Sequence, residues 1–247
     1  MKLIFSIAAV VLFAATGFAQ DRITYDTTEE TDLQLWTGFS INKRIVKGFD
    51  VTWSEELRLK NTLTDLDRIY SVLAVSYEFC PYFKAAVDYT FLALSKDNGW
   101  ELRHRTNLDL TGSYRINPRW KLSLRERFRM TTTTADTDPL LSVNPLWVMR
   151  SRLMAEYTVF SLPIKPYVYF ELSNTLTAPK IIANFVDKIR ASVGVKYALS
   201  AHSEFEFYYR FDVNTAKEIN RTAGKAWHVC SEKEFDHILG VFYEYSF

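Results

Sequence analysis

The chain has 247 residues, of which 48% are hydrophobic and 24% are charged, and its formal net charge is +1. A charge this close to neutral gives no bulk electrostatic basis for nucleic-acid binding, and the length fits one domain. Aromatic residues make up 15% of the chain, while glycine and proline are few. This composition favours long β-strands.

The N-terminal residues have the form of a secretory signal peptide. Lys2 precedes the apolar run Leu3–Ala15, and small residues then lead to a predicted cleavage site after Ala19. The apolar run is shorter than the roughly 20 residues that a membrane-spanning helix needs, which argues against an anchor. We therefore expect a signal peptide over residues 1–19 and one exported domain over residues 20–247.

From Leu33 onward, apolar and polar residues alternate in segments long enough to cross a bilayer as tilted strands. In the segment 49–60, for example, Trp53 and Leu57 share the apolar parity, whereas Glu56 and Arg58 share the polar one. Clear segments of this kind are expected at 33–42, 49–60, 69–79, 83–94, 100–116, 120–130, 147–160, 164–172, 188–199, 203–214 and 235–247.

The connections between these segments alternate between short turns and longer polar stretches. The short turns are Cys80-Pro81-Tyr82, Asn117-Pro118-Arg119, Ser161-Leu162-Pro163 and Ser200-Ala201-His202. The longer stretches are Asn61–Arg68, Ser95–Gly99, Thr131–Pro145, Asn174–Val186 and Thr215–Glu234. This alternation is typical of the periplasmic and extracellular ends of an outer-membrane barrel, and a soluble sandwich would have to turn its charged face outward.

We therefore predict an all-β fold consisting of a single antiparallel transmembrane β-barrel. Bacterial single-chain barrels normally have an even number of strands, so we favour about 12 strands, within a range of roughly 10–12. The twelfth would be a short first strand at Arg22–Thr28. We expect the barrel to be a monomer in the bacterial outer membrane, in contact with outer-membrane lipid.

The chain ends on an aromatic pattern. Tyr243, Tyr245 and the terminal Phe247 alternate along the last predicted strand. Such an ending resembles the signal by which the barrel-assembly machinery recognises outer-membrane proteins, and we expect it to serve that role here.

Two acids break the alternation of apolar and polar residues. Glu55 and Glu126 fall on the apolar parity, where a local bulge, an interfacial depth or an oligomer contact would relieve the cost of the charge.

Cys80 is expected in a short turn and Cys230 in a long loop at the opposite end. That separation exceeds the reach of a disulfide, so two free thiols are expected.

Several segments resemble a known family. Leu35–Phe39 with its early Trp36, the turn from Lys43 to Phe49, and the Glu55–Leu59 segment followed by Asp65–Arg68 are similar to the DUF2490 family. The resemblance covers nearly the whole chain after the signal peptide. It implies an outer-membrane barrel of the kind common in Bacteroidota, without an assigned activity, and it implies no catalytic residues.

Side chains of inward parity form an unusually charged set. Adjacent strands lie about 4.8 Å apart, so the basic members would form a continuous positive wall. The wall consists of Arg58, Arg103, Arg105, Arg125, Arg127, Arg129, Arg150, Arg152 and Arg190. The inward acids, which gather toward the C-terminal strands, include Glu56, Asp109, Glu156, Glu171, Glu204, Glu206 and Asp212.

Two interpretations of this lumen stay open. A basic wall in a narrow tube attracts anions, which predicts a small passive channel for anionic or polar solutes. The same charges could instead pair across the interior and hold a closed structural or adhesive barrel rigid. Trp36 has inward parity beside Gly38, which fits lumen packing or a stacking platform for a solute.

No enzyme signature is evident. A lipid hydrolase of the outer membrane would need a histidine and a serine together on the outer rim. His104 has the outward parity, but the hydroxyl two residues on belongs to Thr106, and His237 has none there. His202 falls in a turn and His228 in a loop. We expect no catalytic residues, no metal, no cofactor and no nucleic-acid partner.

Overall fold

The computed structural model describes residues 24–96, 99–134, 144–177, 186–221 and 227–247 of the chain. The predicted signal peptide and its cleavage site lie outside these residues. In the part described, no helix is long and apolar enough to cross a membrane.

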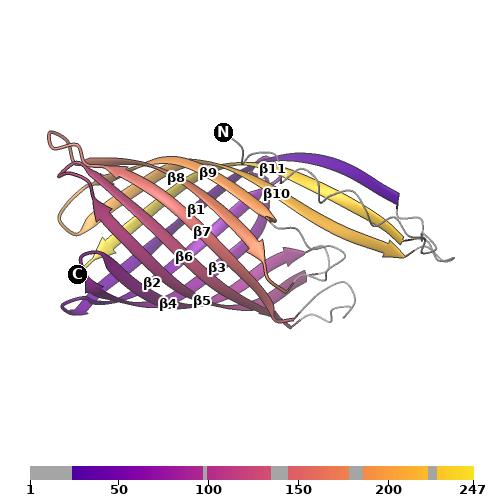
Figure 1. Ribbon diagram of the computed structural model, residues 1–247, viewed down its shortest axis with the longest axis horizontal. Coiled ribbons are helices and arrows are strands. Elements are labelled where there is room, and N and C mark those ends of the chain that lie inside the picture. Colours follow the sequence, from indigo (N-terminus) through magenta and orange to yellow (C-terminus); the bar gives the residue numbers. More distant parts are fainter. Residues whose placement is uncertain (1–23, 97–98, 135–143, 178–185, 222–226) are drawn as a thin grey trace, which may run out of the picture.

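The described residues form a closed β-barrel of eleven strands (Figure 1). The strands are β1 (Thr24–Val46), β2 (Phe49–Lys60), β3 (Asp65–Cys80), β4 (Phe83–Lys96), β5 (Gly99–Arg115), β6 (Trp120–Thr133), β7 (Leu146–Tyr157), β8 (Ile164–Thr175), β9 (Lys188–Ala198), β10 (Ser203–Arg221) and β11 (Trp227–Ser246). We call the end of the barrel that carries Phe247 the C-terminal rim and the opposite end the loop rim.

Consecutive strands pair antiparallel, but the pair that closes the barrel is parallel. β1 and β11 run side by side from Thr24 opposite His228 to Asn42 opposite Ser246. At the C-terminal rim, the Phe247 amide donates to the Asn42 carbonyl at 2.9 Å. An odd number of up-and-down strands leaves the first and last strands pointing the same way, so closure requires a parallel pair.

Eleven strands fall within the predicted range of 10–12, one fewer than the favoured count of twelve, and the barrel is mixed rather than wholly antiparallel. The segment Arg22–Thr28 was expected to supply the extra strand. Its described part, from Thr24 onward, continues into β1 without a turn. The sequence could not reveal this continuity, because the polar residues between Thr27 and Asp32 resemble a loop.

The predicted alternation of outward apolar and inward polar side chains is confirmed. Val193 and Phe207 are 57% and 45% exposed on the outer face, whereas Arg190 and Glu171 are 7% and 0% exposed. Aromatic side chains gather near both rims of the outer face. Trp120 packs against the ring of Tyr157 on the C-terminal side, and Trp100 and Trp147 lie exposed toward the loop rim.

The predicted long loop Thr215–Glu234 is wrong over most of its length. β10 continues to Arg221 and β11 begins at Trp227, and these residues pair with each other. Together with residues 24–34 of β1, which pair only with β11, they form a three-stranded extension beyond the loop rim (Figure 1). Cys230 therefore lies in β11, not in a loop, and its side chain is outside the described residues; Cys80 is free and exposed.

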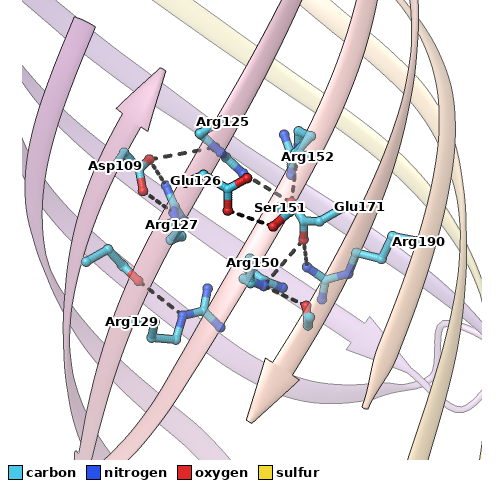
Figure 2. A network of polar contacts seen from close by, with 12 residues as sticks. Asp109, Arg125, Glu126, Arg127, Arg129, Arg150, Ser151, Arg152, Glu171 and Arg190 are labelled. Carbon is cyan, nitrogen blue, oxygen red and sulfur yellow. Dashed lines mark hydrogen bonds and ion pairs between the residues drawn. The ribbon is translucent and has the colours of Figure 1, made fainter. Parts of the chain in front are cut away.

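Glu55 and Glu126 lie on the outer face, and the strands run in regular register through both positions. A bulge is therefore not what relieves either charge. Each carboxylate instead accepts a hydrogen bond from a neighbour on the same face. The Trp53 Nε1–H donates to Glu55 at 3.0 Å, and the Ser151 hydroxyl donates to Glu126 at 2.6 Å (Figure 2).

Candidate functional site

A cavity of about 760 Å³ occupies the lumen and reaches the loop rim. Asn61, in the turn between β2 and β3, and Asp187, just before β9, line its mouth. Trp36 and Phe242 line its deeper part. The volume falls within the roughly 300–1,000 Å³ of common small-molecule sites.

The predicted basic wall lines this cavity, with one exception. Arg103 is not among the lining residues and pairs with Glu101 of its own strand at 2.6 Å. The members that line the cavity are Arg58, Arg105, Arg125, Arg127, Arg129, Arg150, Arg152 and Arg190. Arg68 also lines it. The strand predicted from residue 69 begins four residues earlier, at Asp65, so Arg68 was expected in a loop and not in the wall.

Glu171 of β8 is the centre of the charge network. Its side chain is fully buried, and it accepts contacts from arginines on three strands (Figure 2). The closest contacts are with Arg152 Nε at 2.8 Å, Arg190 Nη1 at 2.9 Å, Arg125 Nη2 at 3.2 Å and Arg150 Nε at 3.3 Å. One buried carboxylate is thus shared by four guanidinium groups, and two of these, Arg125 and Arg190, also contact Asp109 and Asp212.

Two further acids hold parts of the wall in place. Asp109 lies opposite Arg127 in the β5–β6 register and accepts hydrogen bonds from its Nε, at 2.6 Å, and its Nη2, at 2.5 Å. Asp212, also fully buried, pairs with Arg190 Nε at 2.8 Å and with Lys188 Nζ at 3.3 Å. Buried charges are tolerated when they are paired in this way.

The remaining predicted acids lie elsewhere. Glu56 lines the cavity and pairs with Arg58 two residues along β2. Nearer the C-terminal rim, Glu204 lies within 4 Å of two lysines, and Glu206 accepts a hydrogen bond from the Tyr167 hydroxyl. Glu156 faces Tyr167 in the β7–β8 register. The structure therefore does not bring these last three acids to the arginines.

Three of the arginines that line the cavity, Arg105, Arg129 and Arg210, have no carboxylate within 4 Å among the described residues. Arg129 Nε donates to the Asn107 side-chain carbonyl at 3.1 Å, and Arg105 Nε donates to the Thr131 hydroxyl at 3.2 Å. Arg210 lies over aromatic rings, with its Cζ 4.6 Å from the centroid of Trp36. The wall thus divides into arginines that acids neutralise and arginines that have only neutral partners.

A row of alternating aromatic and glycine residues crosses five neighbouring strands of the lumen wall and ends at Trp36, which is paired with Arg58 of β2. Across β8, β9, β10, β11 and β1, the directly paired positions are Tyr167, Gly194, Tyr208, Gly240 and Trp36. We call this row the aromatic–glycine belt. Its three rings are buried, and the Tyr208 ring fills the space where Gly240 lacks a side chain. A ring flanked by glycines can lie flat across the neighbouring strands.

Trp36 serves as packing in this belt. It is 4% exposed, and the Arg58 guanidinium lies 3.3 Å from its ring centroid. The other side of Arg58 contacts Tyr70, at 4.3 Å. Because cations already cover its ring, Trp36 offers no free face on which a solute could stack.

The three histidines whose side chains are described lie away from the lumen. On the outer face, His104 Nδ1 is 2.6 Å from the Tyr89 hydroxyl, and His237 Nδ1 is 2.6 Å from the Tyr209 hydroxyl. His202 contacts the Ser246 carbonyl at 2.8 Å, and the side chain of His228 is outside the described residues. Within the part of the chain that is described, no group of three or more His, Cys, Asp and Glu side chains could hold a metal.

The aromatic residues of the expected assembly signal lie at the end of β11. Tyr243 packs against Phe205 of β10 at 5.1 Å between ring centroids, and Tyr245 packs against Phe247 at 4.9 Å. They line the outer face at the C-terminal rim, next to the pair that closes the barrel.

Comparisons with known proteins give a family without an activity. A search of curated proteins found no match. A family model described as "Protein of unknown function (DUF2490)" matches residues 33–223, which include β2 to β10 and most of β1. Since this match covers well over half of the chain, the protein belongs to the DUF2490 family.

Proposed function

We propose that this protein is a bacterial outer-membrane barrel whose arginine-lined lumen passively admits small anionic solutes. The observation that carries the proposal is the cavity, which reaches the loop rim and is lined by most of the basic wall. The lining holds ten arginines and two lysines against eight acids. In a narrow lumen with low-dielectric walls, such an excess of basic groups raises the local concentration of anions.

The membrane part of the proposal rests on the outer face. Its side chains are apolar along most strands, with aromatic residues near both rims. A band of this kind matches the hydrocarbon region and the two interfaces of a bilayer. The predicted signal peptide and the terminal Phe247 support export and assembly in the outer membrane.

Conductance in planar lipid bilayers tests the proposal. The refolded full chain should give discrete current steps whose reversal potential in a salt gradient favours anions. Replacing Arg125, Arg127 and Arg129 with serine should lower this anion preference. As a matched control, Arg103→Ser removes an arginine of the same region that does not line the cavity, and it should leave the preference unchanged. The absence of current steps at every salt concentration and voltage would refute the channel proposal.

A second candidate is a closed barrel with a structural or adhesive role. The aromatic–glycine belt and the buried Glu171 network favour it, because both fill the lumen with packed or paired groups. In that case the triple serine variant should lose stability, with no current before or after the change. Paired urea-unfolding and conductance measurements on the same variant therefore separate the two candidates.

A further inference from the structure

We infer that Arg105 and Arg129 form a binding subsite for an oxyanion, namely the carboxylate, sulfate or phosphate group of a small solute. This inference rests on the proposed anion-accepting lumen and names the place and the chemistry of recognition within it. Both arginines line the cavity, and both lie in the half of the lumen nearer the loop rim.

The two side chains project from neighbouring strands into the same part of the lumen. Arg105 pairs with Thr131 and Arg129 pairs with Asn107, so the two arginines are diagonal neighbours across β5 and β6. Diagonal neighbours stand about 7–8 Å apart at their Cα atoms. Arginine side chains are long enough to converge over that separation on a single anionic group.

The hydrogen-bond donors of this pair are largely unused. A guanidinium group carries five N–H donors in a planar fork. Among the described residues, Arg129 makes one hydrogen bond, to Asn107 (Figure 2). Arg105 donates to the Thr131 hydroxyl, and its Cζ lies 5.7 Å from the centroid of the Tyr70 ring. Several N–H groups of each arginine are therefore free to bind the oxygen atoms of a ligand, which suits the two-pronged recognition of oxyanions.

The neighbouring charges set this pair apart from the rest of the wall. Arg127, one inward position along β6 from Arg129, is neutralised by the two hydrogen bonds to Asp109. Asp88 accepts hydrogen bonds from the Asn107 and Thr90 side chains and lies 3.8 Å from Arg127 Nη2. An arginine keeps its proton in a protein, so the positive charge of the pair stays available to attract an anion.

Binding to the refolded full chain in detergent micelles tests the inference. Isothermal titration at constant ionic strength would use sodium sulfate, phosphate and glucuronate, with chloride as the background salt. We expect saturable binding of at least one oxyanion, and the order of the three affinities identifies the group preferred. Arg105→Gln with Arg129→Gln should weaken that binding by about tenfold or more, because charge-assisted hydrogen bonds are lost.

Arg103→Gln is the matched control, since Arg103 lies on the same strand, pairs with Glu101 and does not line the cavity. It should bind like the unchanged protein. Arg129→Lys keeps the charge without the fork and should give an intermediate affinity. Faster migration of the unheated barrel on electrophoresis checks that every variant is folded. Absence of saturable binding, or equal binding by the double glutamine variant, would overturn the subsite.

The outcome is distinguishable from failure of the proposed channel. Saturable binding without conductance would support the subsite while removing passive transport. Anion-selective conductance that the Arg105 and Arg129 replacements leave unchanged, together with unchanged binding, would remove the subsite while keeping the channel.

Discussion

At the residue scale, the lumen combines two ways of filling space. Around Glu171, charges neutralise one another in a shared network, and in the aromatic–glycine belt, rings occupy the room that glycines leave. A glycine is required where its neighbour lies closer than any side chain permits. A Cβ added at Gly240 would lie 2.1 Å from Tyr208 Cζ, whereas one added at Gly112 would meet nothing within 4 Å.

This contrast predicts that glycine-to-alanine substitutions at the two positions differ in their effect on the free energy of unfolding. Gly240→Ala should displace the Tyr208 ring and lower the free energy of unfolding by about 1–3 kcal/mol, the usual cost of overpacking. Gly112→Ala should change it by less than about 0.5 kcal/mol. Urea unfolding followed by tryptophan fluorescence measures both, and equal effects would contradict the proposed role of the belt.

At the scale of elements, the three-stranded extension is separable from the barrel. Thr215 pairs with Lys233, and beyond this pair β10 has no partner other than β11. The strand pairs from β2 to β9 therefore contain none of the residues of the extension. Strands outside the wall need no apolar stripe, so the sequence pattern could not reveal them.

We expect a shortened chain, in which residues 216–232 are replaced by Asn-Gly, to fold into the same barrel. Asn-Gly is favoured in two-residue hairpin turns, and all pairing of β10 with β9 is retained. Circular dichroism and the electrophoretic shift on heating should match those of the full chain. Failure of the shortened chain to reach the folded form would mean that the extension is needed to form the barrel.

At the scale of the whole molecule, the parallel pair decides the architecture. β1 and β11 bring Thr37 opposite Val241, a pairing that a twelve-strand antiparallel barrel would not create. Cysteines on directly adjacent strands lie within the roughly 4.4–6.8 Å between Cα atoms that a disulfide requires.

Thr37→Cys with Val241→Cys should therefore form a disulfide on mild oxidation of the folded barrel. The background would carry serine in place of Cys80 and Cys230, so that no native thiol competes. A second pair, Thr37→Cys with Val195→Cys on β9, places the thiols on strands that are not neighbours and should stay reduced. Electrophoresis without reductant reads both results, and a bridge in neither variant would refute parallel closure.

The sequence by itself determined the fold class, the face that each strand turns inward and most of the basic wall. Alternation with period two is a local property, since successive side chains on a strand point to opposite faces. The face of the sheet to which Leu57 or Arg58 points can therefore be predicted without knowing which strands are its neighbours. The family could also be recognised from short segments such as the one around Trp36.

Only the tertiary structure decided the number of strands, the parallel closure and the pairing of charges. These depend on which residues of distant strands come to lie side by side. Nothing local in the chain shows that Glu171 takes four arginines while Arg105 and Arg129 take none of the acids. Register fixes such contacts, because in a closed sheet each strand's position is set by both of its neighbours at once.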